Sequence, residues 1–272
     1  MLKFAYLGSC RYEHVFEHAF PPRLHSIREI NNFFQKINSL STYLSESVSK
    51  DEIMKVYANL VFGDAFNPYI RKKTIEFVPK LENFLKSQFL FIEISSLEYA
   101  ISRCGQIFNK YLVLNEARDS SDKYFNFEIF RDGFLKFEKD NIESFQKQLL
   151  KLKEYTRKFM NLKKIYLIPH SNLKLRSYDE KILKRIEIEE YLKQSLSLDS
   201  VFEIIDIWND SEIKKNYLDD IFNEHPISKK LLNFNDKGNN LVKEYFFKEF
   251  GLSQSHIPQK RIVCNQVVSD KV

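Results

Sequence analysis

Lys3-Phe-Ala-Tyr-Leu-Gly-Ser-Cys-Arg11 is the stretch that decides the fold of this chain. Its apolar run predicts a buried strand over residues 3–7, and Gly8 ends that strand. The spacing of apolar residues from Tyr12 to Phe20 predicts a helix directly after the turn. A strand followed by a helix is the usual opening of an open α/β sheet, in which ligands bind outside the carboxyl ends of the strands.

The same alternation of strand and helix continues along the chain. Apolar runs predict further strands at residues 89–94, 164–168 and 201–205, and helical spacing predicts helices at 27–40, 51–62, 70–86, 141–161, 179–195 and 238–250. Strands separated by helices favour a parallel sheet with helices on both faces. The predicted fold class is therefore α/β, a three-layer sandwich with a mostly parallel sheet.

One segment interrupts this alternation. Tyr124-Phe-Asn-Phe-Glu-Ile-Phe130 and Phe134-Leu-Lys-Phe-Glu138 flank Asp132-Gly133, a dipeptide typical of hairpin turns. We expect an antiparallel β-hairpin inserted at about residues 123–138, standing apart from the main sheet. The chain then forms a single α/β domain over residues 1–255. Residues 256–272 lack hydrophobic periodicity and are expected to be a loosely ordered tail.

The composition restricts the class of partner. The 42 Lys and Arg and the 37 Asp and Glu leave a net charge of +5, and because the basic runs are broken by acids we expect no nucleic-acid partner. The three cysteines lack paired spacing, which argues against a disulfide framework or a metal site and for a reducing compartment. No signal peptide is recognisable, and no segment approaches the roughly 20 apolar residues of a membrane span. We therefore expect a cytoplasmic protein.

Polar residues recur where the predicted strands end. Because parallel strands have their carboxyl ends along the same edge, these residues are expected to line one crevice. They are Gly8, Ser9, Cys10 and Arg11, then His25 and Ser26, then Glu93, Ser95 and Ser96, then His170, Ser171 and Asn172, and finally Asp206.

The residues after the first strand permit two kinds of chemistry. A hydroxyl, a thiol and a guanidinium beside a helix N-terminus suit a nucleophile with an oxyanion hole, and they suit equally the binding of an anionic group. Glu93 lies inside an apolar strand, where a carboxylate is costly to bury unless it is paired. Arg11 or Arg103 is its expected partner.

The motif Gly8-Ser9-Cys10 after an N-terminal strand, with Gly238 opening a late helix, resembles the SGNH/GDSL hydrolase superfamily. It is similar in particular to the GSCFA proteins and to capsule-biosynthesis enzymes whose first block is Gly-Asn-Cys. The resemblance implies an SGNH-like, flavodoxin-like sandwich in which Ser9 attacks an ester or thioester carbonyl. The superfamily's last block, Asp-x-x-His, is not kept, because Lys230 and Asn233 occupy those positions.

The resemblance implies roles for the remaining residues of the crevice. The base is then His225 or His170, with Asp206 to orient it, and the backbone N–H of Ser9 with Asn172 or Ser95 forms the oxyanion hole. Substrate-binding positions are Gly8, Cys10, Arg11, His25, Ser95 and Asn172.

The implied function is that of an O-acyltransferase or esterase in bacterial surface-polysaccharide biosynthesis. It would use a saccharide or glycan acceptor, acetyl-coenzyme A as a donor substrate, and no tightly bound cofactor or metal. The departure at Asn233 leaves two alternatives open. In one, Arg11, His25 and His170 bind a phosphorylated donor for transfer of another group. In the other, the chain is a non-catalytic glycan- or nucleotide-binding module.

Overall fold

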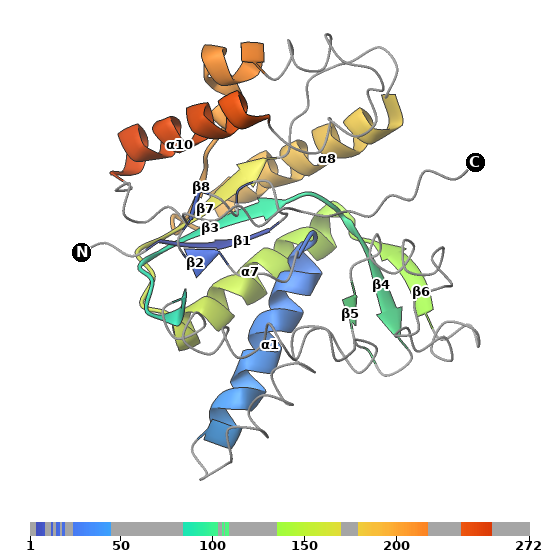
Figure 1. Ribbon diagram of the computed structural model, residues 1–272. Coiled ribbons are helices and arrows are strands. Elements are labelled where there is room, and N and C mark those ends of the chain that lie inside the picture. The colour runs from blue at the N-terminus through green and yellow to red at the C-terminus, as the bar shows by residue number, and fades with distance from the viewer. Residues whose placement is uncertain are drawn as a thin grey trace, which may run out of the picture.

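A parallel five-stranded sheet forms the centre of the computed structural model, which describes residues 4–8, 12, 15–16, 18–19, 24–44, 84–102, 105, 107–108, 135–169, 179–216 and 235–251. Its strands are β1 (Phe4–Leu7), β2 (His18–Ala19), β3 (Phe89–Ile94), β7 (Lys164–Pro169) and β8 (Phe202–Ile204). They lie in the order β2-β1-β3-β7-β8, and each neighbouring pair is parallel (Figure 1). The prediction of an α/β protein with a mostly parallel sheet is confirmed.

The strand order reverses direction once. The chain passes from β1 to β2 on one side and then returns across β1 to β3 on the other, after which β7 and β8 extend the sheet further. In open α/β sheets, ligands bind outside the carboxyl ends of the two strands on either side of such a reversal. The carboxyl ends of β1 and β3 are therefore the first place to look for a site.

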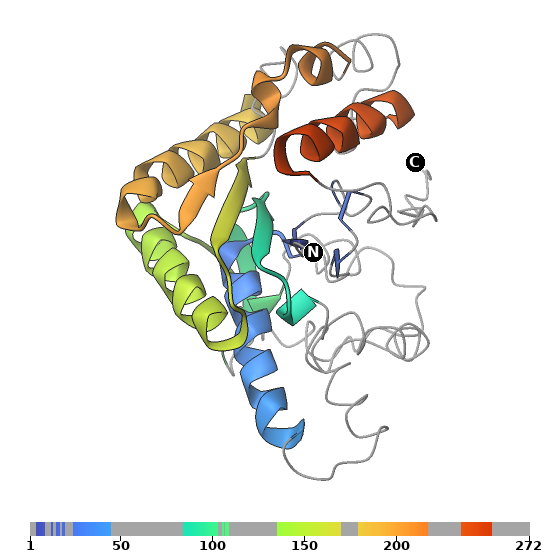
Figure 2. The same cartoon turned by 90° about the vertical axis from the view of Figure 1, so that its left-hand side faces the viewer.

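The two faces of the sheet are buried by different helices. Strand residues such as Leu7 and Ile92 form a hydrophobic cluster with α1 (Ile27–Leu44), α7 (Ile142–Phe159) and α8 (Asp179–Ser195). Alternate strand residues such as Tyr6 and Phe91 form a second cluster with α10 (Asp236–Phe250). Figure 2 shows α10 on the opposite side of the strands from the other three helices. Burial on both faces explains why the strands are nearly continuous apolar runs.

A second, antiparallel sheet follows β3. It contains β5 (Ile107–Phe108), β4 (Glu98–Ser102) and β6 (Leu135–Lys139) in that order, and β3 points towards it (Figure 1). β6 overlaps the second arm of the predicted hairpin, and its described partner is β4. The first arm and the Asp132-Gly133 turn lie outside the described residues, as does the predicted tail over residues 256–272. β4 and β5 were not predicted from the sequence.

The helix predicted from Tyr12 to Phe20 is wrong. His18 and Ala19 instead form β2, which pairs in parallel with β1. Tyr12 and Phe16 are fully buried, and the Phe16 ring stacks on the ring of Tyr6 with centroids 5.3 Å apart. Their helix-like spacing therefore reflects packing of an irregular segment against the aromatic cluster.

The other predicted helices that fall on described residues are confirmed. α8 has the predicted bounds, and α1, α7 and α10 differ from prediction by a few residues at their ends. The helix predicted at residues 51–62 and most of the one at 70–86 lie outside the described residues. Within the part of the chain that the structure describes, no helix has the length and apolar character needed to cross a membrane.

Candidate functional site at the carboxyl edge of the parallel sheet

The carboxyl edge of the main sheet brings together part of the predicted site. Gly8 follows β1, Ser95 follows β3, and Asp206 lies two residues beyond β8. The backbone of His25 lies against the end of β3. The other predicted site residues, which are Ser9, Cys10, Arg11, His170, Asn172 and His225, lie outside the described residues.

Gly8 stands where the backbone passes two buried side chains. Leu7 pairs with Ile92, so the next residues along the two strands, Gly8 and Glu93, lie side by side. A Cβ at Gly8 would lie 2.6 Å from Tyr6 Oη and 2.9 Å from the Cβ of Glu93. Gly8 also has a φ of +155°, which residues with a side chain rarely adopt. Glycine is therefore required at the position that immediately precedes Ser9.

Glu93 is a buried carboxylate beside Gly8. Its side chain is fully buried, and Tyr6 Oη donates a hydrogen bond of 3.0 Å to Glu93 Oε2. The two arginines expected to pair with Glu93, Arg11 and Arg103, lie outside the described residues. The structure thus identifies a tyrosine hydroxyl as one partner of Glu93.

His25 contributes its backbone to this edge. Its carbonyl oxygen accepts hydrogen bonds from the backbone N–H groups of Ser95 and Ser96, each at 2.9 Å. Its own N–H donates to Glu29 Oε2 at 2.9 Å. The loop before α1 is therefore fastened to the carboxyl end of β3.

Ser26 and Glu29 close the N-terminus of α1. The Glu29 N–H donates to Ser26 Oγ at 3.3 Å, and Ser26 Oγ donates to Glu29 Oε1 at 2.9 Å. This is a variant of the Ser-x-x-Glu capping box, with the carboxylate reaching the residue before the cap. Sequence reasoning missed Glu29, although the Ser26-Ile-Arg-Glu29 spacing before an apolar helix is the signal that finds it.

The hydroxyl of Ser95 lies at the carboxyl end of β3, on the same edge of the sheet. Ser95 Oγ is buried and has no hydrogen-bond partner among the residues that the structure describes. Because a buried hydroxyl without a partner is unfavourable, such groups at a sheet edge are candidates for ligand contact.

A charged cluster, which we call the Arg28 clasp, joins α1 to the start of α7 and to β4. Arg28 Nε donates to Asp140 Oδ1 at 2.7 Å, and the guanidinium also reaches Ser144 Oγ at 2.5 Å. The same guanidinium lies 4.7 Å from the centre of the Tyr99 ring. The Asp140 side chain has no exposed surface, whereas that of Arg28 is 26% exposed. The clasp therefore neutralises a buried carboxylate at the carboxyl edge.

Tyr99 links the clasp to the antiparallel sheet. Its hydroxyl donates to Glu138 Oε2 at 2.8 Å. Burial, with a smaller contribution from the bond to Glu138, raises the pKa of the Tyr99 phenol well above its ordinary value. Tyr99 is thus a permanent hydrogen-bond donor, and the small sheet is tied to α1 through its ring.

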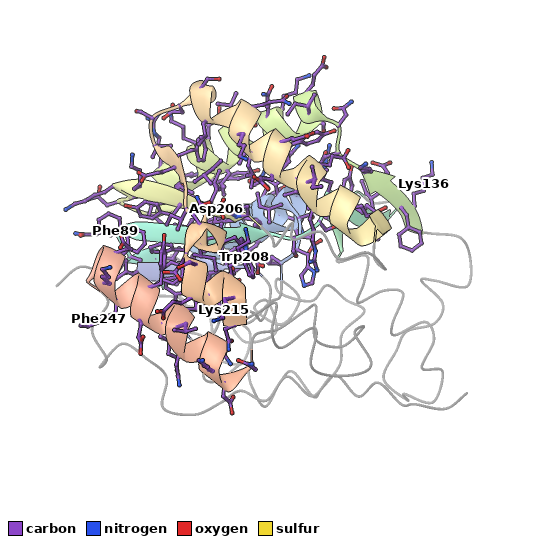
Figure 3. All side chains as sticks on the ribbon, turned by 90° about the horizontal axis from the view of Figure 1, so that it is seen from above. Phe89, Lys136, Asp206, Trp208, Lys215 and Phe247 are labelled. Atoms are coloured by element: carbon purple, nitrogen blue, oxygen red, sulfur yellow. The ribbon has the colours of Figure 1, made fainter. Side chains whose placement is uncertain are left out.

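Asp206 caps a short 3₁₀ turn after β8. Its Oδ1 accepts from the Trp208 backbone N–H at 3.0 Å. Trp208 is buried in the cluster that includes α10 (Figure 3). Burial raises the pKa of Asp206, the bond from Trp208 opposes this, and the nearby Glu189 adds to it. Asp206 is therefore a half-buried carboxylate held in one orientation.

The distance across the strands of the sheet limits which groups the Asp206 carboxylate can contact. β1 and β8 are separated by β3 and β7, so Asp206 lies about 14 Å from Gly8 by strand spacing alone. A carboxylate at that distance acts on the turn after β1 only through a side chain that lies between them.

We expect Asp206→Asn to stabilise the protein at pH 7. Asparagine can still accept from the Trp208 N–H, but it carries no charge to bury. Because the folded-state pKa of Asp206 lies above its ordinary value of 3.8, the folded state binds more protons between the two values. The contribution of Asp206 to stability therefore falls as the pH rises through that window.

Urea unfolding of both proteins from pH 3.5 to pH 7 measures this effect. The free energy of unfolding of Asp206→Asn should exceed that of the wild type at pH 7, and the difference should shrink towards pH 3.5. Asp210→Asn, which alters another capping carboxylate, is the matched control. A variant that is less stable than the wild type at pH 7 would show that the ionised carboxylate is required.

Acidic side chains occupy the helix N-termini that reach this edge. Glu29 lies in the first turn of α1, and Asp140 and Asn141 precede α7, where Asn141 Oδ1 accepts from the Ser144 N–H. These groups use the N–H donors and the favourable potential that an anionic ligand would need. The described residues contain no group of three or more His, Cys, Asp or Glu side chains arranged to hold a metal.

The described residues after β1 do not form a helix. Tyr12, Val15 and Phe16 are irregular, β2 follows, and the first long helix begins at Ile27. The predicted helix N-terminus directly after Gly8-Ser9-Cys10, which was expected to support an anion there, is therefore wrong.

Comparison of the chain with family models, with curated proteins and with solved structures finds no match.

Proposed function

We propose that this chain is an SGNH-like enzyme that acts on acyl esters or thioesters, as an O-acyltransferase or an esterase. Its fold would be the three-layer, flavodoxin-like sandwich with an inserted hairpin. The observation that carries the proposal is the backbone at Gly8. At the reversal between β1 and β3, the chain leaves the strand through a position that has no room for a side chain, and Ser9 follows at once.

In the proposed mechanism, the Ser9 hydroxyl attacks the carbonyl carbon of the donor. The hydroxyl proton passes to an imidazole, and the bond from the carbonyl carbon to the ester oxygen or thioester sulfur breaks as the imidazole returns the proton to the leaving group. A saccharide hydroxyl or water then takes the acyl group from Ser9. The Ser95 hydroxyl, which lacks a described partner, supports its role as a donor to the oxyanion.

We favour His170 over His225 as the base because of its position in the sequence. It directly follows Pro169, the last residue of β7, and β7 lies between β3 and β8. An imidazole there would stand between the turn after β1 and the carboxylate of Asp206. His225 remains the other candidate, from the chain between β8 and α10.

A neutral acyl carbonyl suits the described edge better than a phosphorylated group. At the N-termini of α1 and α7, Ser26 Oγ already accepts from the Glu29 N–H and Asn141 Oδ1 from the Ser144 N–H, so these donors are not available to a phosphoryl group. With acetyl-coenzyme A as donor, only the uncharged thioester end has to reach the edge. The setting in bacterial surface-polysaccharide biosynthesis, with a saccharide or glycan acceptor, belongs to the same proposal and rests on the resemblance of Gly8-Ser9-Cys10.

We expect Ser9→Ala to abolish turnover and leave the fold intact. A hydroxyl at such a turn contributes about 1–2 kcal/mol to stability at most, when it caps local N–H groups. The loss of a nucleophile removes most of the rate acceleration, because members of a catalytic set act as a unit. Hydrolysis of para-nitrophenyl acetate, and consumption of acetyl-coenzyme A with and without a polysaccharide acceptor, separate esterase from transferase.

His170→Ala and His225→Ala, assayed in parallel, identify the base. Full activity in Ser9→Ala, or in both histidine variants, would exclude the proposed mechanism. Ser26→Ala is the control, since it changes a hydroxyl that caps α1 and lies outside the reacting set.

A further inference from the structure

The amino edge of the parallel sheet carries a surface on the side opposite the candidate site. Phe89 and Lys164, the first residues of β3 and β7, are paired there. α7 ends beside this edge, because only residues 160–163 separate it from β7. α10 ends here too, since the Phe250 ring packs against Tyr166 with ring centroids 5.1 Å apart. The ends of two helices and the starts of the central strands therefore share one side of the molecule.

Aromatic rings form the apolar part of this surface. Phe89 stacks between Phe4 and Tyr166, with ring centroids 5.3 Å and 6.2 Å apart, so both faces of its ring are covered and its exposed part is the ring edge. Phe250 is partly buried, whereas Phe247 is 52% exposed. Figure 3 shows Phe89 and Phe247 at the same end of the molecule. Because Phe247 lies on the solvent side of α10, packing of the core does not account for an aromatic residue there.

Basic side chains lie at the same edge. Lys86 precedes β3 and Lys163 precedes β7, and both are exposed. Exposed bases also occupy the last turns of the two helices, which are Arg157 and Lys158 in α7 and Lys248 in α10. A base in the last turn stabilises a helix end, but a lysine that precedes a strand has no such role.

Acidic side chains do not balance these five bases. Asp199 and Glu203, near the start of β8, are each paired with a lysine of their own. The exposed acids next to the five bases along the chain are Glu154 and Glu249. The described part of the amino edge is therefore positively charged as well as aromatic.

We propose that the amino edge of the parallel sheet docks on the surface of an anionic lipid bilayer. Apolar rings and lysines on one surface are the combination that binds at a membrane interface, where the rings enter the head-group region and the bases meet the anionic lipids. A nucleic acid fits less well, because base stacking needs free ring faces and both faces of Phe89 are covered. The candidate site lies at the carboxyl edge, so this docking does not depend on the proposed reaction.

Two sets of variants separate the charge from the rings. Lys163→Gln combined with Lys248→Gln removes two charges from the edge, and Lys136→Gln combined with Lys215→Gln removes two exposed charges elsewhere. Lys136 lies at the opposite end of the molecule from Phe89 (Figure 3).

Phe247→Ala removes the exposed ring. Phe137→Ala is its control, because Phe137 is 47% exposed and lies in β6 of the antiparallel sheet. Thermal unfolding shows that each variant folds.

Cosedimentation of the full chain with vesicles measures the docking. The wild type should bind vesicles of phosphatidylglycerol and phosphatidylcholine in equal parts more tightly than vesicles of phosphatidylcholine alone, and added salt should weaken this binding. Lys163→Gln with Lys248→Gln should weaken it by about tenfold or more. Phe247→Ala should weaken it by about fivefold. Both control variants should stay within about twofold of the wild type.

Four results would overturn the proposal. The first is a wild type that does not bind the anionic vesicles, and the second is an equal loss of binding in the two lysine double variants, which would indicate net charge alone. The third is binding to a single-stranded DNA oligonucleotide but not to vesicles. The fourth is a wild-type dimer in sedimentation velocity that becomes monomeric in Phe247→Ala, because the surface would then be covered by a second copy of the chain.

Discussion

Gly8→Ala should lower the free energy of unfolding by about 2–4 kcal/mol, from the strained backbone and from overpacking. The added methyl would lie 2.6 Å from Tyr6 Oη and 2.9 Å from the Cβ of Glu93. Neither neighbour can move away, because both side chains are fully buried. Urea unfolding monitored by circular dichroism measures the loss.

Gly105→Ala is the control for the backbone contribution. Gly105 has a φ of +81°, but a Cβ built there meets no atom within 4 Å. Its loss should therefore be smaller than that of Gly8→Ala. In the double variant Tyr6→Phe with Gly8→Ala the nearest clashing atom is absent, so part of the stability should return. Equal losses at Gly8 and Gly105 would contradict the close packing beneath the turn.

Arg28→Leu should destabilise the protein by about 3 kcal/mol, because removal of one partner leaves a buried charge uncompensated. The Asp140 side chain has no exposed surface, and among the described residues it would keep only the bond from Ser144 Oγ at 2.6 Å. The contact of the guanidinium with the Tyr99 ring would be lost as well. Chemical unfolding at neutral pH and low ionic strength gives the value.

Two further variants test this explanation. Arg28→Leu combined with Asp140→Asn should be more stable than Arg28→Leu alone, because no charge is then left buried. Lys184→Leu breaks the more exposed contact between Lys184 and Glu98 and should change stability by less than about 1 kcal/mol. An Arg28→Leu protein as stable as Lys184→Leu would mean that the clasp contributes nothing to the fold.

The sequence correctly predicted the strands and helices whose apolar patterns fit only one kind of secondary structure. β3 and β7 are buried on both faces, so their runs are long and unambiguous, and α8 has the predicted bounds of residues 179–195. The prediction of a helix at residues 12–20 failed because Tyr12 and Phe16 have helical spacing but owe their burial to ring contacts with Tyr6 and Phe246. Phe246 is distant in sequence, and the contact with Tyr6 depends on the path of the chain between them, so the local apolar pattern does not report either contact.

From the sequence, the candidate site could be assigned to one edge of the sheet, but the contacts within it could not be predicted. Gly8, Ser95 and Asp206 were correctly predicted to lie along one edge, because each follows a strand and parallel strands place their carboxyl ends together. The bond between Tyr6 and Glu93 joins residues 87 positions apart and depends on the register of β1 against β3. No property of either residue alone predicts that pairing.

The most direct measurement of the central claim is the site of covalent modification by an alkyl fluorophosphonate. The wild-type chain, treated with the reagent and digested, should carry one phosphonyl group on the peptide that contains Ser9, as located by tandem mass spectrometry. Ser9→Ala should take up none, and prior incubation with acetyl-coenzyme A should slow the wild-type reaction. A wild-type chain that remains unmodified, or one that is modified equally in Ser9→Ala, would contradict the assignment of the turn after β1 as the reactive centre.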